Sequence, residues 1–122
     1  MKDGFNQVPF RVQDRHLEAM SNLLGVYIWK VMPMGLKNAP AIFQRVMQHV
    51  LKDLPFADAY IDDVIVGSAG DTLEDVFAQH KKDLLQVLEI LEAADIVVST
   101  KKMQLFLKEV EFCGHILSEG KR

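Results

Sequence analysis

Two adjacent acids, Asp62 and Asp63, separate two short apolar segments, and this pattern limits what residues 56–68 can form. The flanking segments are rich in β-branched and aromatic residues, and Pro55 and Gly67 bound them. They predict two strands joined by a tight turn with both acids at the turn. Such turns prefer Asn-Gly or Asp-Gly, because these residues accept a positive φ, so a pair of acids is unusual there.

A pair of neighbouring carboxylates is costly, because the charges repel and apolar surroundings disfavour ionisation of both groups. A divalent cation removes this cost, and hard ions such as Mg²⁺ bind carboxylate oxygens together with substrate phosphates. A solvated acidic turn on the surface is the alternative interpretation. Residues 56–68 alone leave both interpretations open.

The composition describes a globular chain of 122 residues, either one domain or part of a larger one. Hydrophobic residues make up 49% and charged residues 25%, which excludes a disordered chain. The net charge of −3 gives no overall attraction for nucleic acid. A single cysteine, Cys113, excludes an internal disulfide and indicates a reducing, intracellular compartment. We expect neither membrane insertion nor secretion, because no apolar segment has the required length or position.

The first third of the chain predicts short strands. Residues 25–31 give the stronger signal and residues 15–20 a weaker one, with residues 23–25 as the hairpin connection. Residues 4–10 are expected to be extended, because Pro9 disfavours a helix.

Two helices are predicted on either side of the acidic hairpin. Asn38 as N-cap and Pro40 in the first turn predict a helix over residues 39–53. A capping-box pattern in residues 71–75 predicts a second helix that ends near Ala94. The first helix carries a wide apolar stripe. Its members are Ile42, Phe43, Val46, Met47, Val50 and Leu51.

Further strand candidates follow at residues 96–98 and 110–117. The order of strands, helix, hairpin, helix and strands favours an α+β fold. We expect an antiparallel sheet with two main helices packed on one face. The acidic hairpin would be central, with its turn at one end of the sheet.

Other chemical motifs are weak. The four histidines are far apart, and Cys113 with His115 supplies only two of the ligands that zinc requires. His80 lies on the apolar stripe of the second helix and is interpreted as a histidine at the edge of the core. There is no phosphate-binding glycine loop and no nucleophile elbow. The acid pair therefore points to metal-dependent phosphoryl or nucleotidyl transfer, in which two ions about 4 Å apart also need a third carboxylate from a neighbouring strand.

Four blocks of the sequence resemble those of a known protein family. Residues 60–63, Tyr-Ile-Asp-Asp, resemble the Tyr-x-Asp-Asp box of reverse transcriptases, and residues 29–45 resemble the block that precedes it in gypsy-type LTR retrotransposons. Residues 3–9 resemble the strand around the first catalytic acid, and residues 110–118 the segment after the long helix. The order and spacing of these blocks imply that residues 1–122 are the palm segment of a reverse transcriptase. The N-terminal fingers, the thumb and the ribonuclease H domain would be missing.

The resemblance assigns roles to individual positions. Asp62 would bridge two Mg²⁺ (or Mn²⁺) ions, Asp63 would be the second acid, and Tyr60 would pack near the primer end. Phe5 matches the aromatic residue that lies under the incoming sugar and excludes a 2′-hydroxyl, although Phe5 could also be a plain core residue. Met34 occupies a position where the family usually has Phe. The implied substrate-binding set is Phe5, Asp3, Tyr60, Met34 and Gly35, and the implied primer contacts are Phe112, Gly114 and His115.

One departure from the family pattern affects activity. Alignment of Gly4 and Phe5 with the family motif places the first catalytic Asp one position before Met1, and Asp3 does not replace it. We therefore expect part of an RNA-directed DNA polymerase that extends a DNA primer on an RNA or DNA template with deoxynucleoside triphosphates. The isolated chain is expected to be inactive, and its location cytoplasmic, nuclear or inside a virus-like particle. The alternatives are a non-catalytic retroelement remnant that binds nucleic acid or protein, and an unrelated α+β domain.

Overall fold

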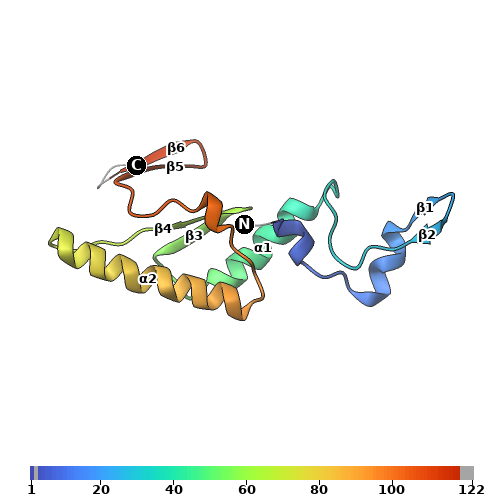
Figure 1. The fold of residues 1–122 in the computed structure, drawn as a ribbon, viewed down its shortest axis with the longest axis horizontal. Helices are drawn as coiled ribbons and strands as arrows, with labels where there is room; N and C mark the ends of the chain where they lie inside the picture. The colour runs from blue at the N-terminus through green and yellow to red at the C-terminus, as the bar shows by residue number, and fades with distance from the viewer. Residues whose placement is uncertain (2, 119–122) are drawn as a thin grey trace.

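The computed structural model describes residue 1 and residues 3–118, which form an elongated α+β molecule (Figure 1). The expected fold class is confirmed, and all strand pairs are antiparallel. In the described part of the chain, the strands form three separate two-stranded sheets rather than one continuous sheet. The elements are η1 (Gly4–Gln7), η2 (Val12–Glu18), β1 (Met20–Asn22), β2 (Gly25–Tyr27), α1 (Ala39–Leu51), β3 (Ala57–Tyr60), β4 (Asp63–Val66), α2 (Leu73–Ala93), η3 (Thr100–Lys102), β5 (Glu109–Phe112) and β6 (His115–Ser118).

The core lies where α1 and α2 pack against the β3–β4 hairpin. The side chains of Phe43 and Met47 on α1 are completely buried, and Val87 and Leu91 are the buried apolar residues of α2. The predicted stripe of α1 is therefore largely confirmed, although Ile42 at its edge is 40% exposed. The helices position the hairpin through burial of one apolar side of each helix.

Both helices begin where the sequence predicts. Pro40 lies in the first turn of α1, and the helix ends at Leu51, two residues earlier than predicted. At α2 the Thr72 side chain accepts a hydrogen bond of 3.1 Å from the Asp75 backbone N–H, which confirms the cap. This bond satisfies one of the free N–H groups of the first helical turn.

The extended conformation predicted for residues 4–10 is mostly wrong. Asp3 has a left-handed conformation with φ 48°, and Asn6 N donates to Asp3 O at 3.0 Å, so the chain turns into the 3-10 helix η1. Extended pairing begins only at Pro9, which forms an isolated antiparallel bridge with Val31. Residues 15–18 likewise lie in η2, so the weak strand signal there was also misleading.

The strand predicted at residues 96–98 does not form. Val97 N donates to Gln7 Oε1 at 2.6 Å, and Gln7 Nε2 donates to Val97 O at 3.2 Å. One side-chain amide thus takes the place of a neighbouring strand. Ile96 is still buried, so this segment covers the core without joining a sheet.

The β1–β2 hairpin projects from one end of the molecule (Figure 1). Leu23 and Leu24 form its turn, as predicted, and residues 20–30 are all exposed. No helix in the described part of the chain is long and apolar enough to cross a membrane.

Candidate active site

The acid pair lies at the end of the β3–β4 hairpin. Tyr60 pairs directly with Asp63, which leaves Ile61 and Asp62 as the two residues of the turn. The predicted turn was thus displaced by one residue, because Asp63 is already the first residue of β4. Ile61 has φ 51°, a left-handed conformation that costs a β-branched residue about 1–2 kcal/mol.

The Asp62 carboxylate points into the protein toward Gly4. Its Oδ1 atom is buried, and no hydrogen-bond partner is found for it among residues 1 and 3–118. A Cβ atom at Gly4 would collide with this oxygen and would lie 3.0 Å from Phe43 Cζ. A buried carboxylate oxygen without a donor is unfavourable, so this atom fits a site completed by a cation. The Asp63 side chain is exposed.

Gln44 on α1 holds the turn from the side. Its Nε2 donates to Ala59 O at 2.7 Å, and its Oε1 accepts from Ile61 N at 2.6 Å. Sequence reasoning missed this residue. The sequence gives one indication of it. Gln44 is a polar residue at the edge of the apolar stripe, directly after the buried Phe43 and three residues before the buried Met47.

The 3-10 helix η1 brings other predicted positions to Asp62. Phe5 is half-buried, and its ring packs edge-to-face on Phe43 with 5.7 Å between ring centroids. Phe5 therefore packs against the core while lying one residue from Gly4. Asp3 precedes η1 and is exposed, and Tyr60 at the end of β3 is 54% exposed.

Met34 and Gly35 form an exposed turn before α1. Met34 is 67% exposed, Gly35 has φ 94°, and a Cβ at Gly35 would meet no atom within 4 Å. Within the described residues, no hydrogen bond or ring contact joins this turn to the acidic hairpin. The structure thus leaves this predicted pair separate from the acids.

A cavity of about 430 Å³ lies between β4, α2 and the segment that leads into β5. Asp62, Asp63 and Phe112 all line it, so β5 reaches the same space as the acids. Gly114 and His115 lie at the β5–β6 turn and are exposed. Of the three predicted primer contacts, Phe112 alone is among the residues that line this cavity.

Comparisons with known proteins decide the family. Residues 1–117 match the family model of the reverse transcriptase (RNA-dependent DNA polymerase). The chain belongs to the reverse transcriptase family. It is 38% identical over 120 residues to the enzymatic polyprotein of Figwort mosaic virus (strain DxS), a match that covers 98% of this chain and 17% of that polyprotein. It is also 38% identical over 120 residues to the retrovirus-related Pol polyprotein from transposon opus of Drosophila melanogaster, with 97% and 11% covered.

Solved reverse transcriptases share the fold. The foamy viral protease-reverse transcriptase in complex with dsDNA aligns with a TM-score of 0.77 and 28% identity, over 98% of this chain and 25% of that one. The same enzyme in complex with an RNA/DNA hybrid gives a TM-score of 0.77 and 29% identity, over 95% and 15%. The polymerase family expected from residues 60–63 is therefore confirmed. The equal identity to a viral and a transposon polyprotein does not single out the gypsy type.

In this reverse transcriptase segment, a partly buried hydrogen-bond cluster around the buried Asp83 joins the far end of the hairpin to α2. Ser68 Oγ donates to Asp83 Oδ2 at 2.5 Å, and Gln79 Nε2 donates to Asp83 Oδ1 at 2.8 Å. His80 Nδ1 lies 3.1 Å from Ser68 Oγ, and its ring packs edge-on against Phe106. Because the serine proton points to Asp83, the histidine must donate rather than act as a base, and the cluster is a structural tie. Sequence reasoning missed Asp83, which is 4% exposed, but placed His80 correctly at the edge of the core.

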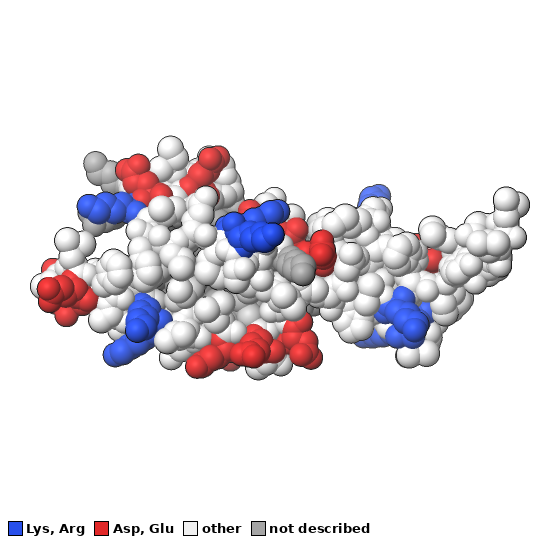
Figure 2. Space-filling view, in the orientation of Figure 1, with Lys and Arg blue, Asp and Glu red and all other residues white. Residues whose placement is uncertain are grey.

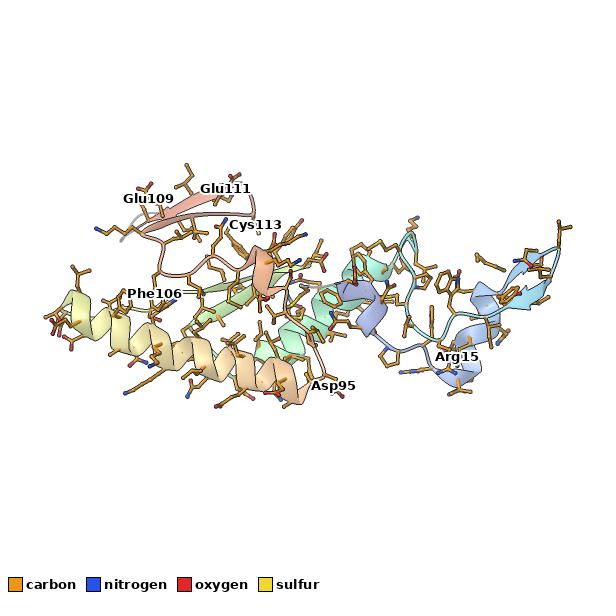
Figure 3. The ribbon with its side chains drawn as sticks, in the orientation of Figure 1. Arg15, Asp95, Phe106, Glu109, Glu111 and Cys113 are labelled. Atoms are coloured by element: carbon orange, nitrogen blue, oxygen red, sulfur yellow. The ribbon has the colours of Figure 1, made fainter. Side chains whose placement is uncertain are left out.

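The charge distribution offers no continuous basic stripe on the face that Figure 2 shows. Asp and Glu gather there over the C-terminal half of α2, where Glu89, Glu92 and Asp95 are exposed. Figure 3 places Asp95 at the end of this helix. This helix surface therefore does not attract phosphates.

The described residues supply some, but not all, of the ligands that a metal ion in a reverse transcriptase would need. Asp62 and Asp63 supply the hard oxygen ligands that Mg²⁺ prefers. Among the described residues, no group of three or more His, Cys, Asp or Glu side chains could hold a metal ion. The donor atoms thus fit such an ion but do not complete its site.

Proposed function

We propose that this chain is the palm segment of a gypsy-type retroelement polymerase, in which Asp62 and Asp63 bind Mg²⁺ or Mn²⁺. The observation that carries the proposal is the buried Oδ1 of Asp62, which has no hydrogen-bond partner among residues 1 and 3–118, beside a second acid at a hairpin turn. The chain spans 17% of the Figwort mosaic virus polyprotein, so the fingers, thumb and ribonuclease H are proposed to lie elsewhere in a longer protein.

The position of Met1 supports a third carboxylate supplied from upstream. The Met1 amino nitrogen donates to Asp62 O at 2.6 Å. In a longer protein, the residue bonded to this nitrogen would lie next to Asp62. The sequence pattern expects the first catalytic Asp at that place, so the three acids would meet at one end of the hairpin.

The chemistry then divides between the ions and the protein. Bound Mg²⁺ or Mn²⁺ would stabilise the attacking and leaving oxygens of an in-line nucleotidyl transfer. Asp62 and Asp63 would supply oxygen ligands and hold them at a fixed turn. Phe5, fixed by its packing on Phe43, would leave no space for a 2′-hydroxyl on the incoming sugar.

The remaining positions are proposed to bind the substrates. The backbone of Asp3 would approach the triphosphate, and the Met34-Gly35 turn would contact the nucleotide once the rest of the polymerase is present. The primer end would lie between Tyr60 and Phe112, with Gly114 and His115 on the same hairpin. Two solved relatives are complexes with dsDNA or an RNA/DNA hybrid, which supports a primer-template duplex as the partner. The single cysteine is consistent with an intracellular setting.

A titration with Mn²⁺ tests the acid pair directly. Paramagnetic broadening of the amide signals of residues 60–63 should appear in the wild-type chain. Asp62→Asn should weaken Mn²⁺ binding by roughly tenfold or more, because it removes an ionised ligand. Asp53→Asn, at an exposed acid after α1, is the matched control and should leave binding unchanged. Equal broadening in wild type and Asp62→Asn would overturn the proposal.

Primer extension tests the expected lack of activity. The 122-residue chain should make no DNA on a primed RNA template with Mg²⁺, because it holds two of the three carboxylates. Addition of an upstream segment that begins with the fingers and supplies the Asp should be necessary for synthesis. Efficient synthesis by the isolated chain would refute this part. Duplex binding that persists unchanged in Asp62→Asn, without Mn²⁺ binding in wild type, would favour the non-catalytic remnant instead.

A further inference from the structure

Gln44 is the only residue of α1 for which side-chain hydrogen bonds to the hairpin are described. We propose that Gln44 is a positioning residue, whose side-chain amide sets the conformation of the Ile61-Asp62 turn and thereby the direction of the Asp62 carboxylate. This proposal rests on the proposed function of the acid pair. It concerns how the pair is held, not which ion the pair binds.

The two hydrogen bonds define one orientation of the amide. Nε2 can only donate and therefore faces Ala59 O at 2.7 Å, whereas Oε1 can only accept and faces Ile61 N at 2.6 Å. Gln44 thus contacts the carbonyl of Ala59, two residues before Ile61, and the N–H of Ile61 itself, where φ becomes positive. It replaces the backbone partner that an adjacent strand would supply.

The residue held in this way is in an unfavourable conformation. Ile61 has φ 51°, which β-branched residues adopt only when surrounding contacts require it. Ile61 directly precedes Asp62, so rotation of Ile61 toward a negative φ would turn the Asp62 side chain away from Gly4. The two hydrogen bonds of Gln44 hold the peptide groups on the N-terminal side of Ile61, and these groups are the frame from which the Ile61 φ directs Asp62.

The base of the Gln44 side chain is itself fixed. Phe43, the preceding residue, is fully buried, its ring packs on Phe5 of η1, and its Cζ would lie 3.0 Å from a Cβ at Gly4. Consecutive residues of α1 therefore contact both structures that confine Asp62, namely η1 and the turn. Helix α1 acts as the rigid support for the acid.

Gln44→Glu tests the hydrogen bonds through the pH dependence of the Ile61 amide resonance, which would not change if the Gln44 side chain only filled space. The protonated carboxyl can both donate to Ala59 O and accept from Ile61 N, as the amide does, whereas the ionised carboxylate can only accept. We expect the Ile61 amide resonance of this variant to lie at the wild-type position at low pH and to shift away as the introduced carboxyl ionises. The wild-type chain, taken through the same pH range, is the control for changes that do not involve residue 44.

Gln44→Met is the matched control, because methionine has a similar length and no hydrogen-bonding amide. In Gln44→Met the Ile61 amide should be displaced at every pH, and its hydrogen exchange should be faster by roughly tenfold, the factor expected for loss of one hydrogen bond. Wild-type chemical shift and exchange at Ile61 in Gln44→Met would overturn the proposal. So would a Gln44→Glu variant whose Ile61 resonance follows the wild-type titration.

Mn²⁺ binding separates the two proposals. If the wild-type chain binds Mn²⁺ at residues 60–63, Gln44→Met should weaken binding while its overall unfolding transition remains cooperative. If the wild-type chain binds no Mn²⁺, the function of the acid pair fails, but the Ile61 shifts still decide whether Gln44 fixes the turn. Unchanged Mn²⁺ affinity in Gln44→Met, with a displaced Ile61 amide, would show that the turn conformation does not matter for the acids and would overturn the positioning role.

Discussion

Gly4 and Asp62 lie in direct contact although they are far apart in the sequence, and the absence of a side chain at Gly4 makes room for the carboxylate. Gly4 is buried in η1, and an added Cβ would overlap Asp62 Oδ1 and approach Phe43 Cζ to 3.0 Å. The flexible partner is the carboxylate, so the carboxylate is the group that would move. The core ring would move little.

Gly4→Ala should therefore harm the acid pair more than the fold. We expect Mn²⁺ affinity to fall by about tenfold and the free energy of unfolding to fall by about 1 kcal/mol, the lower end of the cost of overpacking. Mn²⁺ titration and urea denaturation of the same sample measure the two effects. Gly67→Ala is the control, because a Cβ there meets no atom within 4 Å. A loss of stability without loss of affinity would contradict this account.

The buried Asp83 cluster predicts a strong dependence on Ser68. Ser68→Ala leaves Asp83 Oδ2 buried without its donor, so the free energy of unfolding should fall by about 1–3 kcal/mol. The double variant Ser68→Ala with Asp83→Leu should be less destabilised than the sum of the two single variants, because it buries no unpaired charge. Urea denaturation of the four proteins gives the coupling. Exposed Ser21→Ala should be neutral, and strict additivity in the double variant would refute the interaction.

The β5–β6 turn predicts a stabilising substitution. Cys113 and Gly114 both have positive φ, 52° and 75°, which is the pattern that Asn-Gly satisfies best. Cys113→Asn should stabilise this hairpin by about 0.5–1 kcal/mol, because Asn accepts the left-handed conformation more readily. Slower amide hydrogen exchange in Glu109–Phe112 would show it. Gly114→Ala should have the opposite effect, and faster exchange in Cys113→Asn would contradict the prediction.

The elements that local pattern specifies were predictable. Helix α1 follows from Pro40 and a stripe with helical spacing, although the Asn38 side chain makes no capping hydrogen bond within the described residues. Helix α2 follows from the Thr72 cap. The acidic hairpin follows from apolar strands around a polar turn. In each case the preferences of neighbouring residues agree with the tertiary packing.

The sequence-based predictions fail where a side chain from a distant part of the chain forms the hydrogen bonds that a neighbouring strand would otherwise form. Residues 96–98 have the composition of a strand, but their partner is the Gln7 amide, which no local pattern reveals. Gln44 was missed for the same reason, since a polar residue on a helix is normally solvated. A positive φ at Asp3 turns the chain into η1 where an extended segment was predicted, and a positive φ at Ile61 shifts the hairpin turn by one residue.

The antiparallel bridge between Pro9 and Val31 has a consequence for how the chain can be shortened. Phe10 N donates to Lys30 O, and Met32 N donates to Val8 O, so the chain leaves the body and returns to it at adjacent points. The segment between Phe10 and Lys30, which carries the β1–β2 hairpin, thus begins and ends at neighbouring points. None of its side chains belongs to the buried cluster between α1, α2 and the acidic hairpin. Its excision, with a short linker across the bridge, would yield a minimal scaffold for the acid pair.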